Sequence, residues 1–251
     1  MFLKVWLQEI LLPYIIKAMV HEKEKLTWKE ESAKKNFLDS IMRFFTIQPG
    51  KVRCRTKKPI IVGMIGLIGS GKSSVAQELA SHIGATVIEG DVIRILLRKE
   101  KEKYDNTRKI AEDVGLEIIK ASGNVIFDSD HIDSKKRASL RSKAKEAKTQ
   151  LIFVRTYAEI DNMIGRNMKE SPNEFFSGAS TPWQGSAQER GTVVKLREMI
   201  RRIPHHYRWT NKTGGRLILK KLPFMVFAEI DTTLKWKNDV KKIAEKILKR
   251  F

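Results

Sequence analysis

From residue 59 onward, short apolar runs alternate with longer stretches in which apolar residues recur every three or four positions. The runs are typical of buried strands, and the recurring spacing is typical of helices. The predicted strands cover 60–65, 85–89, 124–128, 150–154 and 224–230, and the predicted helices cover 74–83, 91–97, 106–121, 134–147, 158–169, 189–203 and 234–248. This alternation predicts an α/β domain whose mainly parallel sheet is covered by helices on both faces.

Residues 1–58 show a different pattern, which predicts a helical N-terminal extension followed by a basic linker. Thr27 and Glu30 form a capping box that opens one helix, and residues 51–58 form the linker. Residues 1–20 are mostly apolar, but charged residues interrupt them before they reach the length of a membrane span. That segment is expected either to dock on the rest of the protein or to lie on a membrane surface. The domain boundary is therefore predicted between residues 58 and 59.

The first predicted strand leads into a phosphate-binding loop of the form G-x-x-x-x-G-K-S, and a helix follows. Strand, glycine loop and helix in this order allow backbone N–H groups to surround a phosphate at a helix N-terminus. The predicted nucleotide-binding residues are Gly66, Gly69, Ser70, Gly71, Lys72, Ser73 and Ser74. Lys72 is expected to reach the β- and γ-phosphates, and the Ser73 hydroxyl is expected to bind Mg²⁺.

The second predicted strand ends at an Asp-x-x-Arg sequence formed by Asp91 and Arg94. The carboxyl ends of parallel strands meet at one edge of a sheet, so this pair is expected beside the phosphate loop. Asp91 could take a proton from an attacking hydroxyl group, and Arg94 could hold an anionic group of the acceptor. Asp91 could also simply cap the helix that follows, and the two roles are compatible.

The third predicted strand ends at Asp128, where a carboxylate is expected to help bind Mg²⁺. Asp130 is a second candidate for this role, and a turn that merely ends the strand is the alternative. His131 is expected on the surface of the loop. His205 and His206 are neighbours in sequence, so their side chains should point apart and form no metal pair.

Residues 171–188 interrupt the pattern with Ser, Gly, Pro and Asn, at the place where a lid is expected. Arg166 before this stretch, and arginines after it such as Arg197, Arg201 or Arg202, could close on a transferring phosphate. An exposed loop between solvated helices is the simpler alternative.

The composition adds a strong positive charge, because 49 Lys and Arg residues oppose 29 Asp and Glu residues. A net charge of +20 favours polyanionic partners such as nucleic acid or nucleotides, although a lysine-rich solvated surface would give the same number. The single cysteine, Cys54, excludes an internal disulfide and fits a reducing, cytoplasmic location.

Residues 59–250 resemble the P-loop kinase superfamily, and most of all the polynucleotide kinases, the adenylylsulfate kinases and related AAA-type ATP-binding kinases. The likeness rests on residues 66–73, on Asp91-x-x-Arg94, on 123–128 and on Arg166. It implies a three-layer P-loop NTPase fold with a lid. It also implies roles for Asp91 as general base and for Arg94 as a contact to the acceptor.

Together these features predict an ATP- and Mg²⁺-dependent kinase with Lys72, Asp91, Arg94 and Arg166 as catalytic residues. Its acceptor would be a hydroxyl group of either a polynucleotide 5′ end or a small metabolite. The alternative is an ATP-binding switch that hydrolyses ATP slowly and binds nucleic acid or another anionic partner. A GTPase is disfavoured, because Asn211-Lys212-Thr213-Gly214 lacks the aspartate that would bind guanine.

Overall fold

The computed structural model describes residues 56–99, 104–169, 192–212 and 214–251. The predicted N-terminal extension, apart from residues 56–58, lies outside the described residues, as does the predicted lid at 171–188. The domain boundary at 58/59 therefore stays a prediction, although the first described strand begins at Ile60.

The described part of the chain alternates strands and helices as predicted, and it contains a five-stranded sheet. In chain order the elements are β1 (Ile60–Ile65), α3 (Lys72–Ile83), β2 (Ala85–Glu89), α4 (Gly90–Lys99), the 3₁₀ turn η2 (Tyr104–Asn106), α5 (Thr107–Lys120), β3 (Asn124–Asp128), α6 (Ser134–Glu146), β4 (Gln150–Tyr157), α7 (Ile160–Met168), α8 (Thr192–His206), β5 (Tyr207–Thr210), β6 (Arg216–Leu219), β7 (Ala228–Asp231) and α9 (Lys237–Arg250). The strand order is β2-β3-β1-β4-β7, and every pair is parallel.

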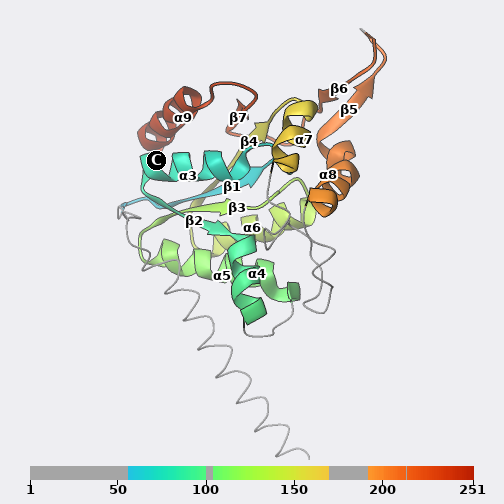
Figure 1. The fold of residues 1–251 in the computed structure, drawn as a ribbon. Coiled ribbons are helices and arrows are strands. Elements are labelled where there is room, and N and C mark those ends of the chain that lie inside the picture. The colour runs from blue at the N-terminus through green and yellow to red at the C-terminus, as the bar shows by residue number, and fades with distance from the viewer. Residues whose placement is uncertain (1–55, 100–103, 170–191, 213) are drawn as a thin grey trace, which may run out of the picture. The chain divides into compact units, whose positions relative to one another are not determined.

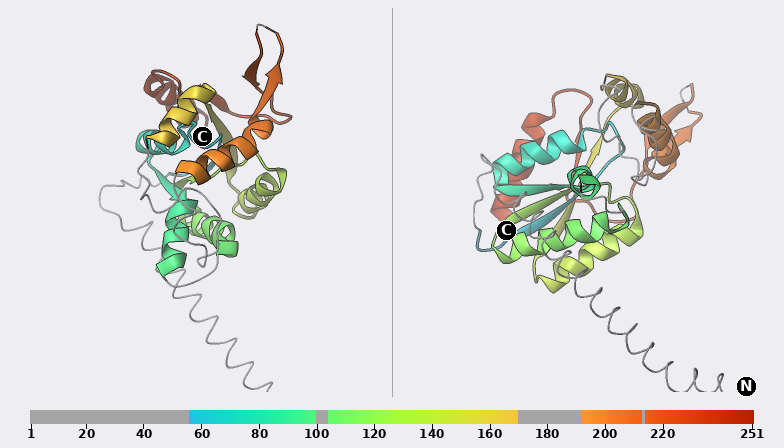
Figure 2. Two further views of the ribbon diagram at one scale, coloured as in Figure 1. Left: turned by 45° about the vertical axis from the view of Figure 1, so that its right-hand side comes forward. Right: turned by 60° about the horizontal axis from the view of Figure 1, so that its bottom comes forward.

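Helices cover both faces of this sheet, which confirms the predicted three-layer α/β fold (Figure 1). Helices α3 and α9 lie on one face, and α5 and α6 lie on the other, as the right-hand view of Figure 2 shows. All six residues of β1 are buried, because this strand has neighbours on both sides and helices on both faces. One core cluster joins β1 to α3 and α9 through side chains such as Met64, Val75 and Val240.

Two predicted strand ends were wrong. Strand β4 runs on to Tyr157, because its polar residues Arg155 and Thr156 are buried rather than solvated. The last strand begins at Ala228 rather than at Phe224. The Phe224 side chain instead lies under the Arg137 guanidinium, 3.7 Å from its ring centroid, and pairing with β4 starts only at Ala228.

Strands β5 and β6 form an antiparallel hairpin that the sequence pattern did not predict, and it extends away from the sheet (Figure 1). Its tip contains Gly214 and Gly215, both with positive φ, which is the conformation that a tight hairpin turn needs. Asn211, Lys212 and Gly214, from the sequence that begins like a guanine-binding motif, therefore lie between β5 and β6. In the described part of the chain, no helix is both long enough and apolar enough to cross a membrane.

Candidate active site

The phosphate loop joins β1 to α3, and its conformation depends on glycine. Gly69 has φ 81° and Gly71 has φ 77°, a region that side-chain-bearing residues rarely adopt. Gly71 immediately precedes α3, so Lys72 is the first helical residue. The N–H groups at the start of α3 therefore lie at the loop, as phosphate binding requires.

Gly66 is required by close packing behind the loop. A Cβ atom at this position would lie 2.4 Å from Thr156 Oγ1 and 2.5 Å from Ser70 Oγ. The hydroxyl groups of Ser70 and Thr156 are themselves hydrogen-bonded at 2.9 Å, and both residues are buried. Ser70, predicted to bind the nucleotide, therefore directs its side chain into the protein and not into the cavity.

The loop opens on a cavity of about 450 Å³ at the carboxyl ends of the strands. Apart from Ser70, every predicted nucleotide-binding, metal-binding and catalytic residue lines this cavity. Of the arginines after the predicted lid, Arg202 lines it and Arg197 and Arg201 do not. The lining residues include Gly66, Gly69, Gly71, Lys72, Ser73, Ser74, Asp91, Arg94, Asp128, Asp130, Lys136, Arg166, Asn167, Lys195 and Arg202. The chemistry-bearing residues of six separate segments thus meet in one place.

Lys72, Ser73 and Asp128 lie together at the floor of the cavity. The Lys72 ammonium donates a hydrogen bond to the carbonyl oxygen of Leu67 at 3.0 Å, so it folds back over the loop. Burial raises the pKa of the Asp128 carboxyl, while the charge of Lys72 and a hydrogen bond with Ser73 oppose this rise. The Ser73–Asp128 contact brings together the two oxygen ligands that Mg²⁺ would need.

Asp91 and Arg94 lie on the first turn of α4 and form an ion pair with each other. Half of the Asp91 side chain is exposed, and Arg94 is less exposed. Both line the cavity, so the carboxylate that was predicted as general base faces the same space as the phosphate loop. This arrangement fits the predicted acceptor side of the site.

Arg166, on α7, is held against the loop rather than extended into solvent. Its guanidinium donates to the carbonyl oxygen of Gly69 at 3.0 Å, to the Thr232 hydroxyl at 2.9 Å and to the Thr232 carbonyl oxygen. Thr232 Oγ1 also lies 3.0 Å from the carbonyl oxygen of Ser70. Arg166 therefore links α7, the end of β7 and the loop.

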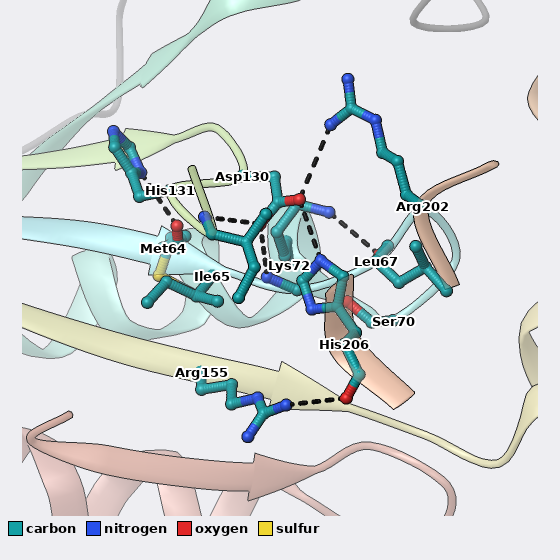
Figure 3. A network of polar contacts seen from close by, with 12 residues as sticks. Met64, Ile65, Leu67, Ser70, Lys72, Asp130, His131, Arg155, Arg202 and His206 are labelled. Carbon is teal, nitrogen blue, oxygen red and sulfur yellow. Dashed lines mark hydrogen bonds and ion pairs between the residues drawn. The ribbon is translucent and has the colours of Figure 1, made fainter. Parts of the chain in front are cut away.

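Asp130 also contacts the loop, and its partners come from distant parts of the chain (Figure 3). Oδ1 accepts a hydrogen bond from the Gly66 N–H at 3.2 Å. Oδ2 lies 3.0 Å from His206 Nε2 and 3.6 Å from an Arg202 guanidinium nitrogen. Burial would raise the pKa of Asp130, but the His206 hydrogen bond and the nearby positive charges hold it well below its usual range.

These contacts of Asp130 bear on its predicted role as a second carboxylate for Mg²⁺. Both carboxylate oxygens of Asp130 already have protein donors, so the geometry favours a bracing role for it over metal binding. Asp128 remains the carboxylate nearest to Ser73. Among residues 56–99, 104–169, 192–212 and 214–251, no group of three or more His, Cys, Asp or Glu side chains could hold a metal ion. A Mg²⁺ ion would therefore depend on nucleotide oxygens and water for its remaining ligands.

The network continues beyond His206 to Arg155, a nearly fully buried arginine on β4 (Figure 3). The Arg155 guanidinium donates to the His206 carbonyl oxygen at 3.1 Å and to the Lys220 carbonyl oxygen at 2.8 Å, and it pairs with Glu229 at 3.0 Å. The end of α8, the end of the hairpin and β7 are thus tied to one strand of the sheet.

Sequence reasoning missed part of this site. Lys136 on α6 and Lys195 on α8 line the cavity, but no motif marks them. His131, expected on the loop surface, is buried, and its Nδ1 lies 2.9 Å from the Met64 carbonyl oxygen. His206 is also buried, and the adjacent His205 is exposed, which fits the expectation that the two point apart.

Comparisons with known proteins bear on the family and the fold. Residues 61–169 match the family model described as AAA domain. A candidate kinase from Chloroflexus aurantiacus shares 14% identity, with 78% of this chain and 100% of that chain covered, at a TM-score of 0.53. The protein APE1195 shares 16% identity, with 78% and 99% covered, at a TM-score of 0.51.

The adenylylsulfate (APS) kinase of Mycobacterium tuberculosis, solved with AMPPNP and APS, shares 16% identity, with 77% and 98% covered, at a TM-score of 0.45. No curated protein matches the chain in sequence. The chain therefore shares its fold with the first two of these solved structures, and its residues 61–169 match the AAA domain family.

Proposed function

We propose that the protein is an ATP- and Mg²⁺-dependent kinase that transfers the γ-phosphoryl group to a hydroxyl group of an acceptor. The observation that carries this proposal is the position of Asp91 and Arg94 in the same cavity as the phosphate loop. A protein that only binds or hydrolyses ATP needs no carboxylate and arginine pair on the acceptor side. The matched AAA domain and the shared fold support the proposal.

The loop side of the cavity is suited to a triphosphate. Lys72 can exchange its hydrogen bond with the Leu67 carbonyl oxygen for phosphate oxygens, because a flexible ammonium group turns at little cost. Backbone N–H groups at the start of α3 add further donors. Ser73 and Asp128 would hold Mg²⁺, which when bound lowers the cost of negative charge on the phosphate oxygens.

The transfer step uses the acceptor side. The acceptor oxygen forms a bond to the γ-phosphorus, the bond between that phosphorus and the β,γ-bridging oxygen breaks, and ADP leaves. Asp91 takes the proton of the acceptor hydroxyl, and Arg94 keeps the carboxylate in position through their ion pair. Arg166, held against Gly69 and Thr232, is placed to stabilise charge that develops on the transferring group.

The test is phosphate transfer from γ-labelled ATP to three acceptor sets: a 5′-hydroxyl oligonucleotide, a nucleoside mixture and a small-molecule extract. Lys72→Ala serves as the blank. We expect Asp91→Asn to lower transfer about 10²–10⁴-fold, because general base catalysis typically contributes that much. Asp161→Asn, an exposed carboxylate on α7 outside the cavity lining, is the matched control and should leave transfer unchanged.

A second candidate function is an ATP-dependent switch, and the Asp130 network is the observation that favours it. Asp130 joins the Gly66 N–H of the loop to His206 and Arg202 of α8, so nucleotide binding could be transmitted to that helix. Slow ATP hydrolysis without any labelled acceptor, unchanged in Asp91→Asn, would support the switch and contradict the kinase. Transfer of the label by the wild type to the 5′-hydroxyl oligonucleotide would instead identify a polynucleotide acceptor.

A further inference from the structure

A second cavity, with a volume of about 390 Å³, is separate from the cavity at the phosphate loop. The described residues that line the two cavities are all different. Strands β4 and β7 supply Arg155 and Glu229 to the second cavity, and the segment 219–226, at the end of β6 and after it, supplies the rest. Its volume falls within the range of about 300–1,000 Å³ that small-molecule sites have. None of the residues assigned above to ATP, Mg²⁺ or the acceptor lines it, so its occupant would be a different molecule.

Arg155 gives the second cavity a buried positive charge that is only partly neutralised. The Arg155 side chain is 1% exposed, whereas the side chain of its ion-pair partner Glu229 is 43% exposed. A buried charge whose partner is largely solvated keeps much of its desolvation cost. The buried Nε of Arg155 also has no hydrogen-bond acceptor within the described part of the chain. The guanidinium group therefore has a donor left for a further anion.

Two lysines add to this positive charge. Lys220 and Lys221 line the second cavity directly after β6. The Lys220 ammonium donates to the carbonyl oxygen of Pro204, which is a neutral acceptor. Among the residues that the structure describes, no carboxylate lies within ion-pair distance of either lysine. Three cations thus oppose the single carboxylate of Glu229 in the lining, and a bound anion would reduce the imbalance.

The remaining lining of the second cavity is apolar. It consists of the side chains of Leu219, Leu222, Phe224 and Val226. Burial alternates along the segment, because these side chains are partly buried while those between them, such as Met225, are exposed. The partly buried side chains form one wall, which we call the apolar wall. A ligand that suits this lining needs an apolar body as well as a negatively charged group.

We infer that the second cavity binds a small monocarboxylate with an apolar body. Its carboxylate group contacts Arg155 and Lys221, and its body packs on the apolar wall. Guanidinium and ammonium groups are the side chains that bind carboxylates most strongly. A polyphosphate suits this cavity less well, because half of the lining residues are apolar and Glu229 would repel a multiply charged anion.

Arg155 also connects the second cavity to the phosphate loop (Figure 3). Its guanidinium donates to the carbonyl oxygen of His206 at 3.1 Å, His206 contacts Asp130 at 3.0 Å, and Asp130 accepts from the Gly66 N–H at 3.2 Å. A carboxylate that accepts from the unused Nε adds a contact without removing any of these, so it stabilises the same arrangement of the loop. Ligand and nucleotide therefore strengthen each other's binding. This coupling rests on the proposed function, because it regulates the nucleotide site of the kinase.

The binding experiment titrates the full chain by calorimetry with octanoate and with phenylacetate, whose apolar bodies are a chain and a ring. Octanamide, which lacks the charge, and acetate, which lacks the apolar body, are the matched ligands and should bind more weakly. We expect Lys221→Glu to weaken octanoate binding by about tenfold or more, because it replaces an attractive charge by a repulsive one. Lys235→Glu makes the same change at an exposed position outside both cavities and should bind octanoate as the wild type does.

Glu229→Gln separates a binding role of this cavity from a structural one. The variant removes the carboxylate that competes with the ligand for Arg155, so we expect octanoate to bind up to about fivefold more tightly. If the ion pair only served the fold, the variant would lower the Tm without any gain in affinity.

The coupling is measured by titrating AMPPNP with Mg²⁺ in the absence and in the presence of saturating octanoate. We expect octanoate to tighten AMPPNP binding by about fivefold or more, and AMPPNP to tighten octanoate binding by the same factor. Arg155→Lys keeps the positive charge, but a lysine cannot contact His206 and the ligand at the same time. This variant should still bind octanoate and should lose the effect on AMPPNP.

Several outcomes would overturn the inference. Equal octanoate binding by the wild type and Lys221→Glu would show that the second cavity is not the site. Displacement of octanoate by AMPPNP would show that octanoate binds in the cavity at the phosphate loop. An AMPPNP affinity that saturating octanoate leaves unchanged would overturn the coupling. If no acceptor is labelled in the transfer assay, the kinase proposal fails, while the octanoate titration still decides whether the carboxylate site exists.

Discussion

The Oδ2 atom of Asp130 lies 3.0 Å from the Nε2 atom of His206, and both side chains are almost completely excluded from solvent. Because the low pKa of Asp130 keeps it ionised, Nε2 of His206 is the donor. The pair joins the segment after β3 to the last residue of α8, 76 positions away in sequence. Removing either partner would leave the other buried without its contact.

We expect His206→Phe to lower the free energy of unfolding by about 2–3 kcal/mol, because a hydrogen bond to a buried carboxylate is lost. His206→Gln, which can still donate to Asp130, should cost less. Denaturant titration measures both. His205→Phe, at the exposed neighbouring position, is the control, and an equal loss there would mean that the Asp130 contact contributes nothing.

Gly66→Ala should both destabilise the protein and abolish nucleotide binding. The added methyl group would meet Thr156 Oγ1 at 2.4 Å and a backbone oxygen of the same residue at 2.7 Å, so the loop must move. Overpacking of this kind costs about 1–3 kcal/mol. Gly165→Ala on α7 has open space and should be neutral or slightly stabilising. Thermal scans and AMPPNP titration test the pair, and unchanged nucleotide affinity in Gly66→Ala would contradict the prediction.

Arg166→Lys should weaken nucleotide binding on the order of tenfold, since a lysine cannot contact Gly69 and Thr232 at the same time. The loop would lose its support from α7. Calorimetric titration with Mg²⁺ and AMPPNP measures the effect. The control is Arg208→Lys, which makes the same substitution on the exposed hairpin, outside the cavity. This variant should bind AMPPNP as the wild type does.

The stability that Glu198 gives to the folded protein should be lost in acid. A hydrogen bond from Arg201 lowers the pKa of Glu198 to about 2; partial burial opposes this effect, and a second hydrogen bond from Arg202 reinforces it. Because the folded-state pKa lies below the unfolded value, the stabilisation is complete above about pH 4.5 and is lost as the pH falls toward about 2. Glu198→Gln should therefore be less stable than the wild type at pH 7 and should approach it at pH 3.

Chemical denaturation at the two pH values checks this expectation. The exposed Glu245→Gln on α9 provides a comparison with the same loss of charge. A stability difference between wild type and Glu198→Gln that stays constant from pH 7 to pH 3 would show that the ion pairs of Glu198 do not stabilise the folded state.

The sequence was sufficient for those parts of the site that lie on local motifs. The loop at 66–73, Asp91, Arg94 and Asp128 follow strands directly, so parallel strand order alone brings them to one edge. The positions of Lys136 and His206 could not be predicted in this way. The two residues are 70 positions apart, on α6 and α8, and only tertiary packing places them beside Asp130.

The hairpin was missed for a different reason. Its strands have four residues each, and burial along them does not alternate clearly. The turn between them looked like an incomplete guanine-binding motif, whereas Gly214 and Gly215 with positive φ were its informative residues. Strand β4 was predicted too short because buried polar residues, here Arg155 and Thr156, resemble the polar end of a strand.

The anchoring of α8 at one end has a mechanical consequence. His206 is fixed to the sheet through Asp130 and Arg155, so a tilt of α8 turns about that end. At 1.5 Å per helical residue, Arg202 lies only about 6 Å from the pivot and Lys195 about 16 Å from it. A ten-degree tilt would displace Arg202 by about 1 Å and Lys195 by about 3 Å. A tilt of α8 would therefore move Lys195 to fit acceptors of different size. It would leave Arg202 nearly in place.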